Sequence, residues 1–204
     1  MRFQAHLLGL ALALLALPAL AQAPQGTPAR VRGTVEKLDG NMLAVKEGNG
    51  QSVKIELAAN YTVRGVVKRS LSDIHEGDFV ASTSTKGPDG KLHAIEVHIF
   101  TEQMKAVVPQ FQSPWDLVPD SYMTNAIVTG MAAAPDGQTL KVKYKDTETE
   151  VVVPANCPIV TYVPGDAGLL KSGAYVVILG TKSPEGKISA ANVTAEKDGV
   201  RPPM

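Results

Sequence analysis

The sequence predicts an all-β protein built from two tandem barrels of five short strands each. Three features predict this fold class: the two halves of the chain repeat one pattern, apolar residues alternate along short segments, and glycine-containing turns separate those segments. Hydrophobic residues make up 44% of the 204 residues, which suffices for a core, but aromatic residues make up 5%. The core is therefore expected to consist mainly of Val, Leu, Ile and Ala.

The internal repeat starts with an offset of 97 residues, which brings Leu43 and Val45 onto Leu140 and Val142. After a one-residue deletion the offset is 96, and residues 55–97 then align without a gap. Agreement falls on turn glycines and on apolar alternation, where backbone geometry restricts residue choice. The repeat predicts two modules, at residues 29–100 and 125–197. Residues 101–124 are expected to link them, and residues 198–204 are expected to form a flexible tail.

Each module is expected to contain five strands. In the first module these are Arg30–Leu38, Met42–Lys46, Ser52–Leu57, Phe79–Thr85 and Leu92–Ile99, with a hairpin at Asp39-Gly40 and a short helical turn at residues 70–74. The second module repeats this order, with strands that include Gln138–Tyr144, Glu148–Val153, Tyr175–Gly180 and Lys187–Ala195. A helical turn between the third and fourth of five strands is the order of a small OB-like barrel, and a two-sheet sandwich is the alternative.

The N-terminus has the pattern of a secretory signal peptide. Arg2 precedes an apolar run at Leu7–Leu20, which is too short to span a bilayer, and Ala19-Leu20-Ala21 provides a small-x-small cleavage pattern. We therefore expect residues 1–21 to be removed on export to the bacterial periplasm; an uncleaved membrane anchor is the alternative. No later segment approaches 18 consecutive apolar residues, so the mature protein is not expected to span a membrane.

Composition argues against several function classes. Arg2 is the one Lys, Arg, Asp or Glu within residues 1–21, so their removal leaves 19 Lys and Arg against 20 Asp and Glu. A chain without excess positive charge is not expected to bind nucleic acid. A single cysteine excludes an internal disulfide framework. The sequence has no nucleophile elbow, phosphate-binding glycine loop or zinc-protease motif, and we expect a non-enzymatic protein without a cofactor.

The Val-x-Gly-x-Val opening at residues 31–35, the Asp-Gly hairpin and the Gly-Asp-x-Val step at residues 77–80 resemble exported bacterial OB-like proteins of unknown function. The Pro-Trp-Asp segment at residues 114–116 is similar to a segment in tandem members of that group. The resemblance covers most of the mature chain. It implies two OB-like barrels and supplies no catalytic residues.

Two groups of residues are candidates for binding. Trp115, Asp116 and Tyr122 lie in the proline-containing linker, where a large aromatic side chain either packs between the modules or forms an exposed recognition patch. A basic cluster, expected on the loop after the third strand, consists of Arg64, Lys68 and Arg69. Loops of OB-like barrels often bind ligands, but a solvated charged loop is the alternative.

The histidines and the cysteine suggest less. A metal site built from His75, His93 or His98 is possible chemically, but the five-residue spacing of His93 and His98 places them on opposite faces of a strand. His98 shares a face with Glu96, and we expect that face to be exposed to solvent. Cys157 is expected to be a small buried residue at a strand end.

These features predict a periplasmic binding or scaffolding protein that presents a groove between two barrels. Its partner would be an unidentified protein or another envelope component. A metal-binding accessory protein using surface histidines is the main alternative, and a hydrolase with an unrecognised pair of acids is a third hypothesis.

Overall fold

The computed structural model describes residues 26–204, so the expected signal peptide lies outside the described residues. The expected all-β class is confirmed. The strands are β1 (Thr27–Asp39), β2 (Met42–Glu47), β3 (Ser52–Arg69), β4 (Phe79–Lys86), β5 (Leu92–Ile99), β6 (Phe111–Trp115), β7 (Ser121–Ala134), β8 (Gly137–Tyr144), β9 (Thr147–Pro154), β10 (Ile159–Gly165), β11 (Tyr175–Lys182) and β12 (Ile188–Ala195). The helical segments are η1 (Leu71–Asp73), α1 (Glu102–Lys105) and η2 (Ala167–Leu169).

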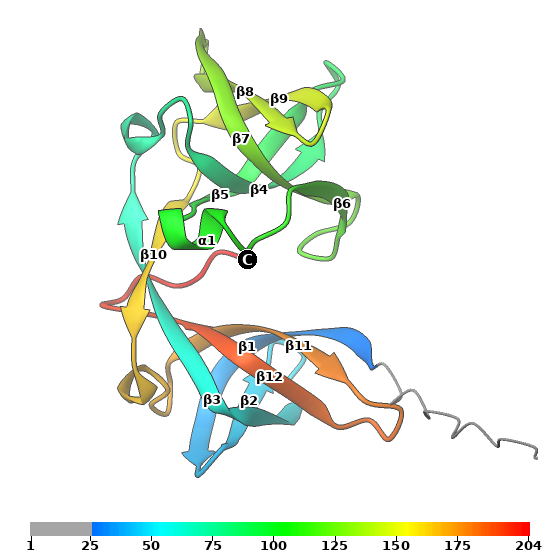
Figure 1. Ribbon diagram of the computed structural model, residues 1–204, viewed down its shortest axis with the longest axis vertical. Helices are drawn as coiled ribbons and strands as arrows, with labels where there is room; N and C mark the ends of the chain where they lie inside the picture. Colours follow the sequence, from blue (N-terminus) through cyan, green and yellow to red (C-terminus); the bar gives the residue numbers. More distant parts are fainter. Residues whose placement is uncertain (1–25) are drawn as a thin grey trace, which may run out of the picture.

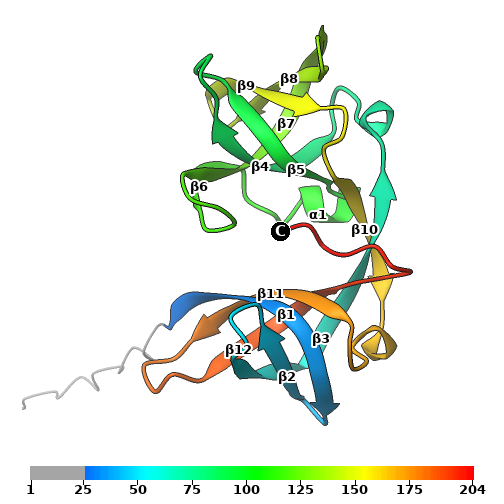
Figure 2. The same cartoon turned by 180° about the vertical axis from the view of Figure 1, so that it is seen from behind.

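Strand pairing closes two rings of five strands, which form the two ends of the molecule in Figures 1 and 2. The first ring contains β1, β2, β3, β12 and β11, and it closes where β11 pairs with β1. The second ring contains β4, β7, β8, β9 and β5, and it closes through a short parallel pairing of β5 with β9. Closure leaves few unpaired strand edges.

The expectation of two tandem barrels is not confirmed, because each ring combines strands from both repeats. The first ring takes three strands from the first repeat and two from the second, whereas the second ring takes the complementary set. As a result, residues 79–154 form the second ring as one continuous segment that is inserted into the first ring. The expected boundaries at residues 29–100 and 125–197 do not separate the rings.

The length of β3 explains this exchange. We expected a strand that ends at Leu57, but β3 continues to Arg69; it still pairs with β12 up to Gly65 and only then leaves its own ring. Beyond Leu57 it pairs with β10, which returns from the second ring, with Val63 opposite Gly165 and Arg69 opposite Ile159. This antiparallel pair connects the rings (Figure 1). Along it, each repeat passes from one ring to the other.

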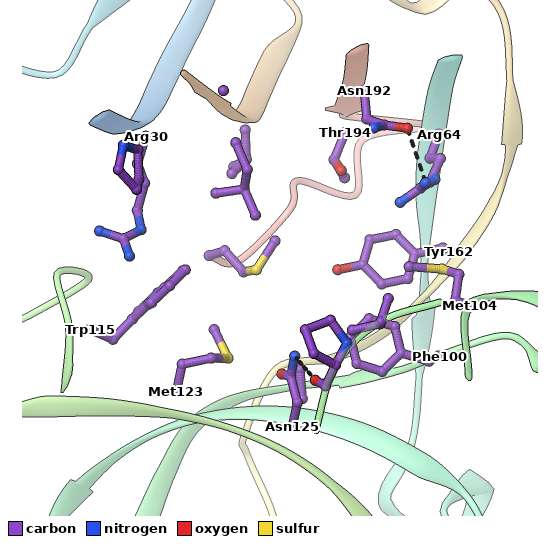
Figure 3. A pocket seen from close by; sticks show the side chains of 18 of the residues that line it. Arg30, Arg64, Phe100, Met104, Trp115, Met123, Asn125, Tyr162, Asn192 and Thr194 are labelled. Carbon is purple, nitrogen blue, oxygen red and sulfur yellow. Dashed lines mark hydrogen bonds between the residues drawn. The ribbon is translucent and has the colours of Figure 1, made fainter. Parts of the chain in front are cut away.

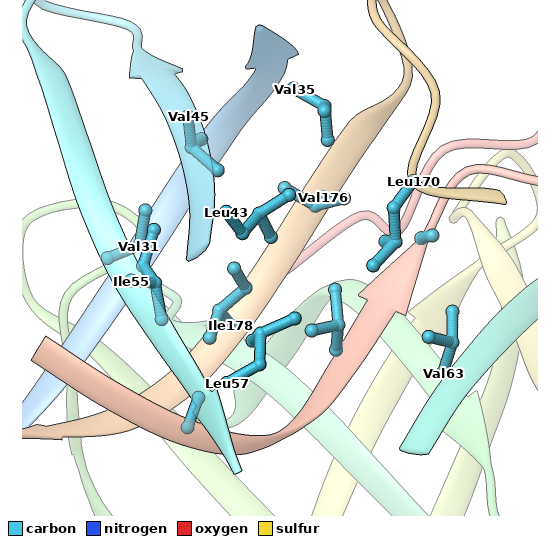
Figure 4. Packing of buried hydrophobic residues seen from close by; sticks show 13 residues of the cluster. Val31, Val35, Leu43, Val45, Ile55, Leu57, Val63, Leu170, Val176 and Ile178 are labelled. Carbon is cyan, nitrogen blue, oxygen red and sulfur yellow. The ribbon is translucent and has the colours of Figure 1, made fainter. Parts of the chain in front are cut away.

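Each ring encloses its own apolar core, and in both cores aliphatic side chains predominate, as expected from the low aromatic content. The first core includes Val35, Leu43, Ile55 and Ile178, all at most 1% exposed (Figure 4). The second core is formed largely by equivalent positions, and among these are Val80, Val97, Val128, Leu140, Val142, Val151 and Val153.

The expected linker and tail are both ordered parts of the fold. Residues 101–124 include α1 and β6, and they connect β5 to β7 within the second ring instead of joining two modules. The chain after β12 turns back between the rings (Figure 2), where Pro202 and Met204 are buried. The tail therefore contributes to the space between the rings.

Candidate functional site

A cavity of about 410 Å³ lies between the two rings, and we call it the groove (Figure 3). Both rings and the segments that connect them supply its walls. The first ring contributes Arg30, Arg64, Val177, Leu179, Asn192 and Thr194, and the second contributes Ala81, Met123 and Asn125. The volume falls within the range of about 300–1,000 Å³ that is common for small-molecule sites.

Strand alternation explains how one sheet serves both a core and the groove. On β4, Val80 points into the core of the second ring, and the next residue, Ala81, lines the groove. On β7 the same holds for Ala126 and Asn125. Because successive side chains point to opposite faces, the outer faces of β4 and β7 form the floor of the groove.

At one end of the groove, a cation–π contact and ion pairs link β1 to Trp115 on β6 and to Asp116, which follows it. The guanidinium of Arg30 lies 4.1 Å from the centre of the Trp115 ring, and Asp116 accepts hydrogen bonds from Arg32 at 2.7 Å and from Arg30 at 3.4 Å. Burial alone would raise the pKa of Asp116, but the hydrogen bond from Arg32 and the two positive charges outweigh it and lower the pKa. The carboxylate is therefore stabilised in its charged form.

Replacing Asp116 with Asn is expected to reduce the free energy of unfolding at neutral pH by up to about 1 kcal/mol, since the pair is half exposed to solvent. A lowered pKa stabilises the fold above the unfolded-state pKa, and this contribution is lost as the pH falls through the folded-state pKa, below 3.8. The stabilities of the wild type and D116N should therefore converge below about pH 4, as measured by urea unfolding across pH. The variant D146N, in an exposed turn, serves as the control; a gap that persists at low pH contradicts this account.

At the other end of the groove, Arg64 and Tyr162 project from the paired strands β3 and β10. Tyr162 lies opposite Val66, two residues from Arg64, so both side chains lie on one face of the sheet. Arg64 donates a hydrogen bond to Asn192 Oδ1 at 3.1 Å. The Tyr162 ring stacks on Phe100, with ring centres 5.8 Å apart, and these contacts fix the end wall.

Two buried polar atoms of the groove lining have no hydrogen-bond partner within residues 26–204. Asn125 donates to the carbonyl of Pro109, but its buried Oδ1 accepts nothing. The buried Nε1–H of Trp115 donates to no acceptor. The hydroxyl of Tyr162 has no partner either, and it points into the groove in Figure 3. Buried polar groups normally form hydrogen bonds, so these atoms are available to a bound molecule.

Behind Tyr162 lies a buried acid–base pair, Glu96 and His98. His98 Nε2 lies 2.6 Å from Glu96 Oε2, outside hydrogen-bond alignment, and both side chains are at most 1% exposed. Glu96 accepts from the backbone N–H and the hydroxyl of Thr83, and His98 stacks on Tyr162 with ring centres 5.2 Å apart. The expectation that Glu96 and His98 share a face is confirmed, but their expected exposure to solvent is wrong, since the ring of Tyr162, from the neighbouring strand β10, stacks on His98 at that face.

The structure brings together some of the candidate binding residues and separates others. Trp115 and Arg64 line the groove, with Asp116 beside it. Lys68 and Arg69 belong to β3, so the basic cluster lies on a strand and not on the expected loop, and both are exposed outside the groove. Tyr122 is exposed on β7 and also lies outside the groove.

The three histidines of the described chain lie apart. His75 is exposed near Asp78, at 3.8 Å, and His93 is partly exposed near Asp89, at 3.0 Å, whereas His98 is buried. Within residues 26–204 no group of three His, Cys, Asp or Glu side chains has the arrangement of a metal site. Cys157 is half-buried beside the second core, and burial raises its pKa to about 12, so its thiol remains protonated.

Comparisons with known proteins give no match to a protein-family model, a curated protein or a solved structure. The resemblance to exported OB-like proteins therefore stays a prediction. Separately, no helix between residues 26 and 204 is long and apolar enough to cross a bilayer.

Sequence reasoning missed Asn125, Tyr162 and Met204 as lining residues of the groove. For Tyr162 a signal exists, because its repeat partner is Val66 and a tyrosine replaces a small apolar residue there. Asn125 follows a polar residue at the start of β7, and nothing in its neighbourhood distinguishes it from a surface side chain.

Proposed function

We propose that the protein is a non-enzymatic binding protein whose groove takes up a small, mainly apolar molecule without covalent chemistry. The observation that carries this proposal is an apolar cavity of small-molecule size, lined by buried polar groups that lack partners. Apolar walls supply affinity, and a few fixed polar groups orient the ligand. A cavity of this size favours a small molecule over the scaffolding role, which requires a larger surface.

The chemistry of the lining supports binding over catalysis. Within the described part of the chain, the titratable side chains that line the groove are Arg30, Arg64 and Tyr162. Burial raises the pKa of Tyr162, so its hydroxyl remains a hydrogen-bond donor at ordinary pH. Arg64, the neutral Tyr162 and Arg30, which is paired with Asp116, can bind a ligand. They do not form a pair of nucleophile and general base.

We also propose that both rings are OB-like barrels of a duplicated ancestor and that the protein acts in the bacterial periplasm. The ring order, with a 3₁₀ turn before β4 and before β11, supports the first point. The pattern of residues 1–21 supports the second.

Titration with N-phenyl-1-naphthylamine, a neutral dye that fluoresces in apolar sites, tests the groove. We expect saturable binding to the wild type. Thr194 is a half-buried lining residue on β12, so Thr194→Phe should fill the groove and weaken binding at least tenfold. The matched control is Thr149→Phe, a half-buried position on β9 outside the groove. Equal dye affinity in both variants contradicts the proposed site.

A further inference from the structure

The charge balance of the groove singles out Arg64. The described lining contains two arginines and no Asp or Glu. Arg30 is compensated by Asp116, but Arg64 forms no ion pair with any residue in 26–204. Among the described residues its hydrogen-bond partner is the neutral side-chain oxygen of Asn192, which also accepts from Thr62. A half-buried guanidinium beside an apolar cavity is thus left with donors that no anion occupies.

Tyr162 provides an independent observation at the same place. Its side chain is 7% exposed, its hydroxyl has no hydrogen-bond partner among the described residues, and Figure 3 shows that hydroxyl directed into the groove beside Arg64. Tyr162 lies opposite Val66 in the pairing of β3 with β10, so its side chain and that of Arg64 project from the same face of the sheet and both line the groove. Stacking on His98 and Phe100 fixes the ring, so the hydroxyl is a preorganised donor.

The rest of the groove is apolar and partly aromatic. Met104, Met123, Phe111 and Trp115 line it, with Met104 beside Tyr162 at the Arg64 end and Trp115 beside Arg30 at the other end (Figure 3). Methionine and aromatic side chains accommodate flat apolar groups through polarisable contacts. A ligand that satisfies Arg64 and Tyr162 must therefore continue as an apolar body.

We propose that the ligand is a small amphipathic monocarboxylic acid, with its carboxylate bound by Arg64 and the hydroxyl of Tyr162. Its apolar body, preferably aromatic, lies against the wall formed by Met123 and Phe111. This inference rests on the proposed function and adds the chemical class of the ligand. The planar guanidinium fork of Arg64 matches the geometry of a carboxylate.

The test compares 4-phenylbutyrate with 4-phenylbutan-1-ol, which has the same apolar body without the charge. Binding to the full chain is followed by NMR through the indole N–H signal of Trp115, which is unambiguous because the chain has one tryptophan. We expect the acid to bind the wild type at least tenfold more tightly than the alcohol. Arg64→Met should abolish that difference, and the matched control Lys68→Met, on the same strand outside the groove, should preserve it.

A second variant separates a ligand role from a structural one, since Arg64 also links β3 to Asn192. Tyr162→Phe removes a single hydroxyl that forms no internal hydrogen bond, so the fold is retained, and affinity for the acid should fall about tenfold. Equal affinity of acid and alcohol for the wild type overturns the inference and leaves the groove proposal standing. If neither these ligands nor the neutral dye binds, the proposed function fails and the inference fails with it.

Discussion

Replacing His98 with Ala is expected to lower the free energy of unfolding by about 3–5 kcal/mol, because it leaves the carboxylate of Glu96 buried without its partner. Glu96 is 1% exposed, and its remaining contacts are two hydrogen bonds from Thr83. Water cannot solvate the charge without opening the sheet beside β10. Urea unfolding followed by far-UV circular dichroism measures the loss.

A double substitution tests the origin of this loss. Glu96→Gln in the H98A background removes the buried charge and keeps an acceptor for Thr83, so it should restore at least about 1 kcal/mol. If it restores nothing, the cost of H98A comes from the cavity alone and not from charge. The control is His93→Ala on the same strand, where the imidazole and Asp89 are partly exposed, and no change of the unfolding midpoint is expected there.

Proline substitutions in the two rings are expected to have unequal consequences. Val45 and its repeat counterpart Val142 are both buried in central strands, where proline removes a backbone donor and is not tolerated. Val45→Pro should unfold the first ring and leave the second ring folded, since all five strands of the second ring lie within the continuous segment 79–154. Val142→Pro should unfold both rings.

Chain connectivity is the reason for this asymmetry. The folded second ring holds Arg69 opposite Ile159, and this closes the 89-residue segment between them. When the second ring unfolds, the first ring must close a flexible loop of that length, at a cost of about 4 kcal/mol. Small barrels of this size have little stability to spare. NMR spectra of the two variants report which amide signals remain dispersed; a first ring that stays folded in V142P contradicts the account.

Most strands of the protein could be predicted from the sequence, with β6 and β10 as exceptions, whereas their pairing partners could not. The predicted and observed strands agree at Leu92–Ile99, and most others differ by one to three residues at an end. Alternation and turn residues are local properties, so one sequence suffices to find them. Strand pairing between the repeats is not a local property. Because both repeats have the same pattern, the sequence does not indicate whether β1–β3 pair with β4 and β5 or with the equivalent strands β11 and β12. The segment between Leu57 and Ser70 contains no turn, because β3 runs through it to Arg69, and this long strand is the feature that allows the two repeats to exchange strands.

The candidate site was predicted in part. Trp115 is conspicuous as the one tryptophan, and Arg64 belongs to a visible basic cluster. Tyr162 lies on β10, a strand without a clear sequence pattern, and its place in the groove depends on the pairing of β10 with β3. For His98 the periodicity gave the correct face relative to Glu96, but burial of that face by β10 depends on residues about 60 positions later in the chain.

The pairing of β3 with β10 has a consequence for symmetry. Val66 and Tyr162 lie opposite each other in this pairing, and they are also equivalent positions of the repeat, 96 residues apart. An approximate twofold axis therefore passes between them and exchanges the two rings. A groove beside such an axis with identical walls would accept an elongated molecule in two opposite directions. Here the equivalents of Tyr162 and Arg64 are Val66 and Val160, so divergence of the two copies gives the groove a single polarity.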